Sequence, residues 1–240
     1  MAAGEHMDNE VTAILFVHGI QGSPAQFQWM INQLPPRIHY ENVLLAGHGG
    51  NVEAFRHARK KEWQDQVNDT AIKLCRQYRR VCYVGHSMGC LLGMEAAKQS
   101  GVHFSSMLLL ACPLSLRPTF AYFRNNLLAV SNYHGGNPYI LSVKNANSVF
   151  AKHAWEYLFC LHPYLELLRL IRGARKAPQK PINHVTAFFF EKDEIVGKKA
   201  SRLAKQQFGF TTVQLPQCGH DYWTTSAKEQ MMVCLIDALQ

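Results

Sequence analysis

The sequence predicts an α/β fold, in which a mostly parallel sheet of about six strands is flanked by helices. Short, wholly apolar segments alternate along the chain with longer segments whose apolar residues recur at helical spacing. Strands that are buried on both faces, and the amphipathic helices that cover them, produce this pattern. The chain has 240 residues, 48% of them hydrophobic and 18% charged, which suits one sizeable domain with a proper core.

The predicted strands and helices follow one another with short connections along most of the chain. Strands are expected within 12–17, 42–50, 81–84, 106–111, 184–190 and 211–215. Helices are expected at 24–34, 62–78, 88–99, 197–208 and 223–239. The helix at 62–78 has the clearest pattern, because its apolar residues share one helical face: Trp63, Val67, Ala71, Leu74 and Tyr78.

The alternation stops after Pro113 and resumes near residue 182. Between these points lie aromatic-rich segments that are expected to be helical, "FAYFRNNLLAV" and "AWEYLFCLHPYLELLRLI". We therefore expect a core made of residues 1–112 and 182–240, with 113–181 inserted after one strand of the sheet.

The net charge is +8, and basic residues cluster at 169–180 ("RLIRGARKAPQK") and, more scattered, at 55–63 ("FRHARKKEW"). Neither cluster is interleaved with aromatic residues as in a nucleic-acid-binding motif, so no nucleic-acid partner is expected. A solvated basic surface is the main interpretation. Attraction to acidic substrates or to an anionic lipid surface is the weaker alternative.

Targeting and metal-binding signals are missing from the sequence. No run of about 18 uncharged apolar residues predicts a membrane span, and the first residues lack the pattern of a secretory signal. The seven cysteines are odd in number and contain no C-x-x-C pair, which predicts reduced thiols in a cytoplasmic protein. No histidine and cysteine cluster has zinc-ligand spacing, so we expect neither a metal nor another cofactor.

The stretch "VGHSMG" places Ser87 between Gly85 and Gly89, where a predicted strand gives way to a helix. Ligands bind at the carboxyl ends of the strands in open parallel sheets, so this turn is a candidate site. A sharp strand-to-helix turn exposes a serine Oγ and leaves little room beside it, which explains both glycines. Taken alone, the pattern also fits an ordinary glycine-rich turn.

A candidate acid follows another predicted strand. Asp193 comes shortly after the strand 184–190, and its short carboxylate suits the fixing of an imidazole ring. Glu191 and Glu194 lie beside it and are expected to be solvent-exposed acids of the loop.

A candidate base follows the last predicted strand. His220 comes after Gly219, and a histidine in this place can take the proton of a serine and later return it. Asp221 is a rival acid, but it is poorly placed to bond to the ring of its own neighbour.

The order Ser87, Asp193, His220 is that of the α/β-hydrolase triad. Together with "FVHGIQGS", "AGHGGN", "VGHSMG", "KDEIV" and "CGHDYW" in sequence order, it makes the chain resemble the small carboxylesterase and monoacylglycerol-lipase-like serine hydrolases. The resemblance covers nearly the whole chain and is weakest in 113–181, where it implies a lid. It also implies a six-stranded core without the first two strands of the full fold.

The resemblance implies a role for each matching residue. Ser87 would be the nucleophile, His220 the general base and Asp193 the acid that orients it, while the N–H groups of Ile20 and Met88 would form the oxyanion hole. Three neighbours, in contrast, are expected to shape or pack the site without reacting: His18, His86 and Cys90. Many relatives have a glycine three residues before the acid, where this chain has Phe190; Val196, three residues after it, matches.

These observations together predict a hydrolase that cleaves carboxylic esters through an acyl-enzyme. The apolar residues of the lid predict a substrate with an apolar, medium-length acyl chain, since ligand sites are mainly apolar. Two alternatives stay open. The same triad could cleave a thioester, an amide or a C–C bond, and the basic run 169–180 would suit a phosphate-bearing thioester. The chain could also be a non-catalytic binding protein on this fold.

Overall fold

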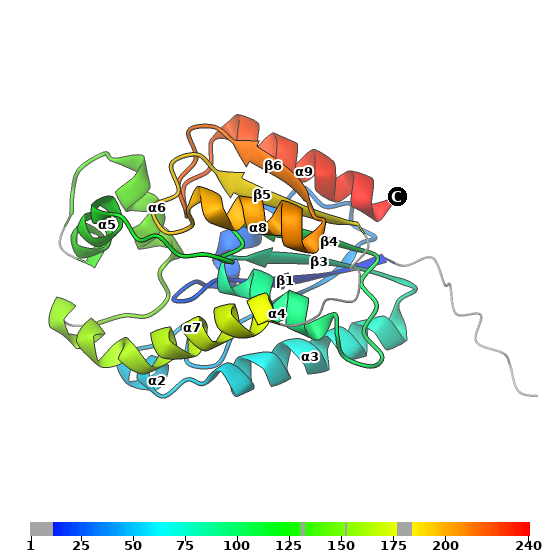
Figure 1. The fold of residues 1–240 in the computed structure, drawn as a ribbon, viewed down its shortest axis with the longest axis horizontal. Coiled ribbons are helices and arrows are strands. Elements are labelled where there is room, and N and C mark those ends of the chain that lie inside the picture. Colours follow the sequence, from blue (N-terminus) through cyan, green and yellow to red (C-terminus); the bar gives the residue numbers. More distant parts are fainter. Residues whose placement is uncertain (1–11, 131–132, 152, 177–183) are drawn as a thin grey trace, which may run out of the picture.

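The computed structural model describes residues 12–130, 133–151, 153–176 and 184–240. In this part of the chain, six strands form one sheet in the order β2-β1-β3-β4-β5-β6 (Figure 1). They are β1 (Thr12–Val17), β2 (His39–Val43), β3 (Arg80–His86), β4 (Ser106–Leu110), β5 (Val185–Phe190) and β6 (Thr211–Leu215). All five pairings are parallel, which confirms the predicted sheet.

The sheet is flanked by helices from most of the strand connections. They are η1 (Pro24–Phe27), α1 (Gln28–Ile31), α2 (Val52–Arg56), α3 (Lys60–Gln77), α4 (Met88–Ala96), α8 (Lys198–Phe208) and α9 (Thr225–Leu239). The predicted face of α3 is the buried one, with Trp63, Val67, Ala71 and Leu74 fully covered. Close packing of α4 on β3 depends on Gly93, because a Cβ there would lie 2.2 Å from the Tyr83 ring.

The second strand differs from its prediction. It spans His39–Val43, so it begins before the expected segment 42–50 and ends early within it. It is an edge strand with one neighbour and none of its residues is buried, which fits its mostly polar sequence. The apolar residues that suggested a strand, Leu44 and Leu45, lie in the loop that follows; Leu45 is buried and Leu44 exposed.

The described residues of the connection between β4 and β5 form four helical elements. They are α5 (Phe120–Val130), α6 (Pro138–Ala146), η2 (Ala154–Cys160) and α7 (Leu161–Lys176). Figure 1 shows α5 and α6 beyond one end of the sheet, whereas α7 runs back beside α3 and α4. The helix α6 was not predicted. Residues 177–183, which include the expected boundary near 182, lie outside the described residues.

Backbone hydrogen bonds join this connection to loops of the core. Leu116 forms an antiparallel bridge with Val196, and the Arg117 N–H donates to the Ile195 carbonyl at 2.7 Å. Farther along, Phe150 forms a parallel bridge with Asn51. The start of the β4–β5 connection is therefore attached to the loop that carries Asp193.

The remaining predictions concern membrane-spanning helices and the state of the cysteines. No helix in the described part is both long and apolar enough to cross a membrane. All seven cysteines are free, and six of them are buried.

Candidate active site

Ser87 occupies a strained turn between β3 and α4. Its φ is 50° and its ψ is −117°, a positive φ that residues other than glycine rarely adopt. The Ser87 N–H donates to the Leu110 carbonyl at 2.8 Å, and the Ser87 carbonyl accepts from the Cys90 N–H at 2.9 Å. The turn is therefore fixed on both sides of the serine.

The glycines around Ser87 are required by close backbone contacts. A Cβ at Gly89 would lie 2.1 Å from the Val17 carbonyl oxygen, and one at Gly85 would lie 2.8 Å from the Cys90 nitrogen. A Cβ at Gly19, in the loop after β1, would lie 2.9 Å from Ser87 Cβ. The small residues therefore let β1, the turn and α4 meet at this point.

The three residues singled out in the sequence form one hydrogen-bonded line. His220 Nε2 lies 3.0 Å from Ser87 Oγ, and His220 Nδ1 lies 2.9 Å from Asp193 Oδ2. When the ring carries its proton on Nδ1, facing the carboxylate, Nε2 accepts a hydrogen bond from the serine hydroxyl. The residues follow β3, β5 and β6, so tertiary structure joins positions as much as 133 residues apart in the chain.

His220 and Asp193 are both shielded from solvent, with side-chain exposures of 7% and 2%. Burial lowers the pKa of His220, but the charge and hydrogen bond of Asp193 raise it, and Asp221 and Glu194 raise it further. The net result is a pKa raised from 6.5 to about 9. The ring therefore holds a proton more readily than a free histidine does.

Asp193 is held in place by the backbone that follows it. Its Oδ1 accepts hydrogen bonds from the N–H groups of Ile195, at 2.8 Å, and Val196, at 2.7 Å. Its own N–H donates to the Phe190 carbonyl at 3.2 Å, so the turn forms although Phe190 stands where many relatives have glycine. The carboxylate is thus oriented before it meets the His220 ring.

The loop that contains Ile20 is held by a histidine of a different loop. His48 Nε2 accepts from the Gln21 N–H at 3.0 Å, and the Gln21 carbonyl accepts from the Ser148 N–H at 2.7 Å. Gln21 adopts a φ of 57°, so both sides of an unfavourable conformation are tied down. Sequence reasoning gave His48 no role of its own. Its signal was only the "AGHGGN" pattern.

Ile20 and Met88 carry the amides that the resemblance assigns to an oxyanion hole. Met88 is the first residue of α4, where a helix leaves its N–H groups without intrahelical partners. In the described part of the chain, neither the Ile20 nor the Met88 N–H donates a hydrogen bond. Ile20 follows Gly19 and Met88 follows Ser87, and Gly19 and Ser87 are neighbours in space.

The chain matches the family model described as "Alpha/beta hydrolase family" over residues 14–231. It belongs to the alpha/beta hydrolase family. The resemblance stated from the sequence motifs is thereby confirmed, and so is the fold.

Solved structures of several enzymes resemble this one over most of both chains. A metagenome-derived lipolytic enzyme (LipS or LipT) has a TM-score of 0.67 at 15% identity, with 95% of this chain and 93% of that chain covered. The monoacylglycerol lipase of Paleococcus ferrophilus has a TM-score of 0.64, also at 15% identity and with the same coverage. The prodiginine-pathway thioesterase RedJ of Streptomyces coelicolor has a TM-score of 0.62 at 15% identity, with 96% and 91% covered. No curated protein sequence gives a match.

The histidines expected to pack in this alpha/beta hydrolase are buried and bonded. His18 Nε2 accepts from the Leu45 N–H at 3.1 Å; burial, followed by the nearby His48, lowers the pKa of His18 to about 3. His86 Nε2 lies 3.1 Å from the His220 carbonyl oxygen. Complete burial lowers the pKa of His86 well below 6.5. The Cys90 thiol is also fully buried, which raises its pKa and leaves it protonated.

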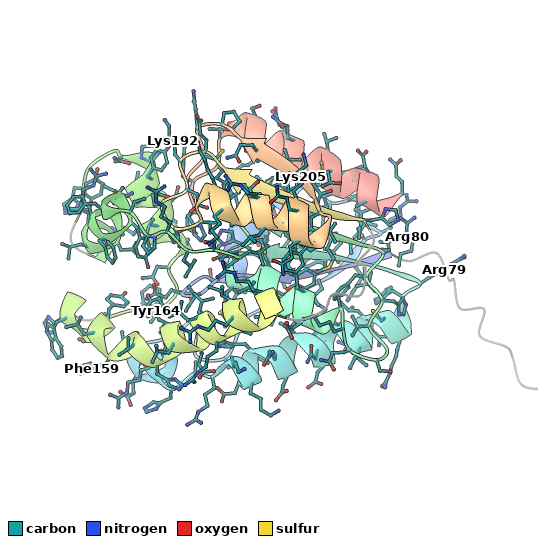
Figure 2. All side chains as sticks on the ribbon, in the orientation of Figure 1. Arg79, Arg80, Phe159, Tyr164, Lys192 and Lys205 are labelled. Carbon is teal, nitrogen blue, oxygen red and sulfur yellow. The ribbon has the colours of Figure 1, made fainter. Side chains whose placement is uncertain are left out.

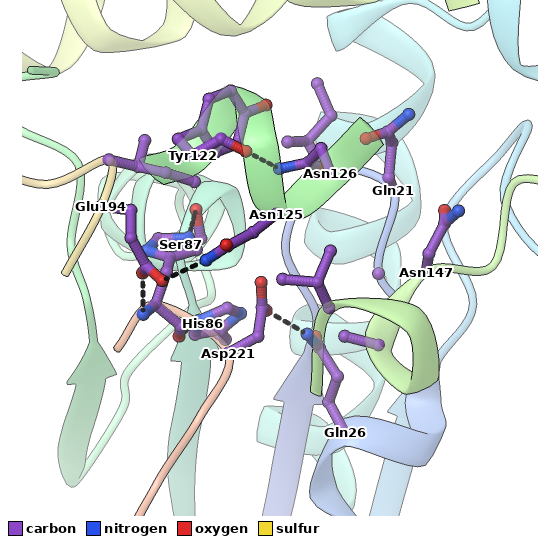
Figure 3. Close-up of a pocket in the computed structure, with 16 residues that line it drawn as sticks. Gln21, Gln26, His86, Ser87, Tyr122, Asn125, Asn126, Asn147, Glu194 and Asp221 are labelled. Carbon is purple, nitrogen blue, oxygen red and sulfur yellow. Dashed lines mark hydrogen bonds between the residues drawn. The ribbon is translucent and has the colours of Figure 1, made fainter. Parts of the chain in front are cut away.

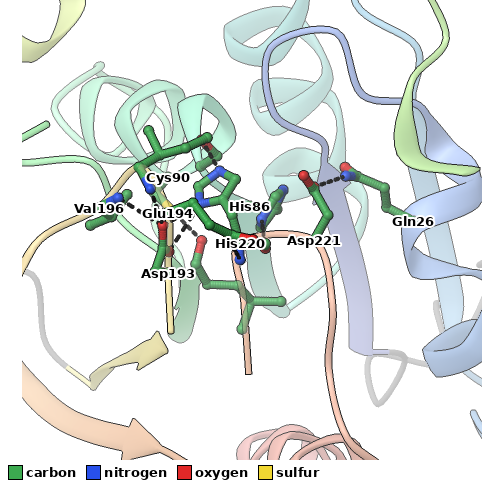
Figure 4. A network of polar contacts seen from close by, with 11 residues as sticks. Gln26, His86, Cys90, Asp193, Glu194, Val196, His220 and Asp221 are labelled. Atoms are coloured by element: carbon green, nitrogen blue, oxygen red, sulfur yellow. Dashed lines mark hydrogen bonds and ion pairs between the residues drawn. The ribbon is translucent and has the colours of Figure 1, made fainter. Parts of the chain in front are cut away.

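The acids around Asp193 do not all behave as expected. Glu191 is exposed, as predicted. Glu194, in contrast, is only partly exposed, and its Oε2 accepts from the His220 N–H at 2.9 Å (Figure 4). The prediction of a solvated acid is wrong at this position, because the loop after β6 packs across it. Asp221 Oδ1 accepts a hydrogen bond from Gln26 Nε2 at 3.1 Å, and Asp221 makes no hydrogen bond with the His220 ring.

A cavity of about 60 Å³ lies beside Ser87 (Figure 3). Its walls come from the loop after β1, from α5 and α6, and from the loops after β5 and β6. They include apolar residues, amides and two carboxylates: Ile20, Gln21, Gly22, Gln26, His86, Tyr122, Asn125, Asn126, Val143, Ala146, Asn147, Glu194, Ile195, His220 and Asp221. Of the large apolar residues predicted for the lid, Tyr122 alone lines this cavity within the described residues.

The charges around this cavity are acidic. Glu194 and Asp221 line it, whereas none of its described lining residues is a lysine or an arginine. Burial raises the pKa of Asp221 from 3.8 to about 6, and Glu194 and Asp193 add to the increase against the opposing effect of His220. Within the described part of the chain, no group of three histidine, cysteine or acidic residues could hold a metal ion.

Proposed function

We propose that this alpha/beta hydrolase cleaves carboxylic esters through an acyl-enzyme formed on Ser87. The observation that carries the proposal is the line from Ser87 Oγ through both ring nitrogens of His220 to Asp193. Ser87 Oγ attacks the ester carbonyl carbon as His220 Nε2 takes its proton, and His220 then protonates the departing alkoxide. Asp193 orients the ring and stabilises the imidazolium. Water completes the cycle by attacking the acyl-enzyme, with His220 again as the base.

The oxyanion of each tetrahedral intermediate would be held by the N–H groups of Ile20 and Met88. Their support is the lack of any other acceptor for these groups in the described part of the chain. The bonds of Gln21 to His48 and Ser148 fix the loop in advance, so it would not reorganise during the reaction. A donor of this kind stabilises the transition state by about 2.7–4 kcal/mol.

Replacement of the proposed nucleophile tests the reaction. Ser87→Ala should lower kcat for p-nitrophenyl esters by about 10⁴-fold or more, because no other group in the site can form the acyl-enzyme. Ser226→Ala removes a hydroxyl from an exposed position on α9 and should leave turnover unchanged. Turnover retained by Ser87→Ala would refute the assignment.

The same pair of variants separates an enzyme from a non-catalytic binding protein. A fluorophosphonate should label the natural protein and Ser226→Ala covalently, because an activated serine attacks the phosphorus centre. It should leave Ser87→Ala unlabelled. Absence of labelling in the natural protein would favour the binding protein.

The proposed substrate is an ester with an apolar, medium-length acyl chain. Ile20, Val143, Ala146 and Ile195 supply apolar wall near Ser87, but a cavity of about 60 Å³ is smaller than a usual ligand pocket. Such a chain would enter only after α5 and α6 move, and we propose that the β4–β5 connection acts as this lid. A series of p-nitrophenyl esters of increasing acyl length tests the idea, and activity confined to acetyl esters would contradict it.

An ester fits the site better than a phosphate-bearing thioester does. The carboxylates of Glu194 and Asp221 line the cavity without a lysine or arginine among its described residues, which disfavours an anionic substrate near Ser87. The structural neighbour RedJ is a thioesterase, so thioester cleavage is the alternative to measure. Thiol release from an acyl-CoA faster than alcohol release from the matching ester would reverse the preference.

We further propose a cytoplasmic protein whose lid can touch a lipid surface. The free, mostly buried cysteines suit a reducing compartment. Large exposed apolar residues concentrate in the β4–β5 connection: Phe120, Phe123, Leu127, Leu141, Phe150, Trp155, Leu158, Phe159, Leu161, Leu165 and Leu168. Figure 2 shows Phe159 near the outer end of this region. Failure to sediment with anionic phospholipid vesicles would contradict lipid binding.

A further inference from the structure

His220 is held at four points, two of them on its backbone. Its ring nitrogens face Asp193 and Ser87, as described above. Its carbonyl oxygen lies 3.1 Å from His86 Nε2, and its N–H donates to Glu194 Oε2 at 2.9 Å. The backbone contacts decide where the ring stands, because the ring can reach both partners only from the correct Cα position.

Glu194 is the one of these four partners that also reaches the β4–β5 connection. Its second carboxylate oxygen, Oε1, accepts from Asn125 Nδ2 at 3.2 Å (Figure 3). Asn125 lies on α5 and is only 3% exposed. The Glu194 carbonyl accepts from the Thr119 N–H at 2.9 Å, just before α5 begins. A single side chain thus bridges α5 and the loop of the proposed base.

The packing around this bridge leaves little freedom. A Cβ at Gly219 would lie 3.1 Å from Glu194 Oε2 and 2.8 Å from the ring of Tyr139 on α6. The Tyr139 hydroxyl donates to the Gln217 carbonyl at 2.9 Å in the same loop. The loop that carries His220 therefore contacts α6 directly and is linked to α5 through Glu194.

The helix α5, which this bridge joins to the His220 loop, also forms part of the cavity beside Ser87. Tyr122, Asn125 and Asn126 of α5 form part of the wall beside Ser87, and the space between is about 60 Å³. Because α5 forms part of this wall, an ester has to displace α5 while it enters, and α5 can return once the ester carbonyl lies at Ser87. When α5 moves away, Glu194 loses the hydrogen bond from Asn125.

We propose that Glu194 is a positioning residue that couples the placement of α5 to the placement of His220. With α5 closed, Asn125 holds one carboxylate oxygen so that the other is aimed at the His220 N–H. With α5 displaced, the carboxylate turns away and His220 is held less firmly. Full alignment of the base therefore accompanies closure over the bound ester. The inference rests on the proposed ester hydrolysis.

Direct participation of Glu194 in the proton transfer does not explain its contacts. Its oxygens bond to a backbone N–H and to an amide, while the ring nitrogens of His220 are occupied by Ser87 and Asp193. Glu194 therefore acts on the backbone position of His220 and not on its ring nitrogens.

Three variants and one control test the coupling. Asn125→Ala removes the α5 contact of Glu194, together with the hydrogen bonds that Arg124 donates to Asn125 Oδ1. Glu194→Ala removes both side-chain contacts of Glu194, and Glu194→Gln keeps the shape of the side chain without its charge. Glu229→Gln makes the same charge change on an exposed position of α9. Each is checked for folding by circular dichroism and thermal unfolding; if Glu194→Ala fails to fold, Glu194→Gln takes its place.

Steady-state kinetics should show losses in kcat with little change in KM. We expect Glu194→Ala to lower kcat about 10- to 100-fold, because a small misplacement of a reacting group has effects of this size. Asn125→Ala should lower kcat about 3- to 10-fold. Added to Glu194→Ala, Asn125→Ala should have no further effect, since the same link is already broken.

The pH profile separates positioning from general structural support. The charged or titratable groups facing His220 are Asp193, Asp221, Glu194 and His86. Glu194→Gln removes a charge that raises the pKa of His220, so the midpoint of kcat/KM should move to lower pH. Asn125→Ala keeps all of these charges and should leave the midpoint in place, as should Glu229→Gln.

Two results would overturn the inference: an unchanged kcat in Asn125→Ala, or independent, multiplicative losses when it is combined with Glu194→Ala. Ser87→Ala is assayed beside them. If it stays active, the proposed function fails. If it is inactive while the variants of Glu194 and Asn125 behave like the natural protein, the coupling alone fails.

Discussion

Acidification from pH 7.5 to pH 5 should destabilise this protein through buried histidines that do not take part in the proposed proton transfer. His18, His48 and His86 are 0%, 7% and 1% exposed. Burial, followed by the effect of His48, lowers the pKa of His18 to about 3, and burial lowers that of His48 to about 4. The pKa of His86 is lowered well below 6.5, also mainly by burial.

The sign follows from comparing folded and unfolded chains. A group whose pKa is depressed by folding contributes its full stability above about pH 6.5 and loses it as the pH falls, because only the unfolded chain then takes up the proton. The loss is about 1.4 kcal/mol per pH unit below 6.5, or about 2 kcal/mol per group at pH 5. His18 and His48 together therefore lose about 4 kcal/mol. His86 adds to this loss.

Two groups near Ser87 oppose this loss. Asp221 has a folded pKa of about 6, above its usual 3.8, so it regains about 1.4 kcal/mol between pH 6 and pH 5. His220, with a pKa raised from 6.5 to about 9, stays protonated in the folded chain and gains about 1.4 kcal/mol of stability as the pH falls from 7.5 through 6.5. The net loss from His18, His48, Asp221 and His220 is about 1 kcal/mol, and the loss from His86 adds to it, against the roughly 5–15 kcal/mol that stabilises a typical domain.

Urea unfolding at pH 7.5 and pH 5 measures this loss directly. In His48→Gln, an amide oxygen can still accept from the Gln21 N–H but does not titrate, so the difference between the two pH values should shrink by about 2 kcal/mol. His57→Gln, at an exposed position of the same region, should leave the difference unchanged. Equal stability at both pH values, or an undiminished loss in His48→Gln, would refute the reasoning.

Two further outcomes are expected. Gly89→Ala should destabilise the fold by about 3 kcal/mol or more in urea unfolding, because its Cβ would lie 2.1 Å from the Val17 carbonyl oxygen; a loss below about 1 kcal/mol would show that the turn can relax. The kcat/KM for a p-nitrophenyl ester should rise with pH and reach its midpoint above 6.5, because His220 must lose its proton to act as a base and its pKa is raised to about 9. A midpoint below 6.5, measured over pH 5–10, would contradict this.

Much of the fold could be predicted because its signals are local. The central strands are buried on both faces, so their sequences are short apolar runs, as "TAILFV" shows for β1. The edge strand β2 has one neighbour and a polar sequence, and its position was predicted less well. The helix α2 was missed, although Asn51 caps it by accepting from the Ala54 N–H, because five residues are too few for a periodic pattern.

The candidate site was predictable to the extent that each residue follows its own strand in a recognisable motif. Ser87, Asp193 and His220 could be selected one by one, and the carboxyl ends of parallel strands lie at one edge of a sheet. The support for these residues was not predictable. Glu194 looked like any loop acid in the sequence, since its partners His220 and Asn125 lie 26 and 69 residues away.

The sequence alone thus determined the central strands of the sheet, the order of Ser87, Asp193 and His220 along it, and the glycines that the sharp turn requires, because backbone conformation and burial leave their pattern in neighbouring residues. Tertiary structure decided the acidic lining of the cavity, the burial of His48 against the Ile20 loop, and the bridge from α5 to His220. Each of these depends on the distance between side chains from separate elements, and residue spacing along the chain carries no record of that distance.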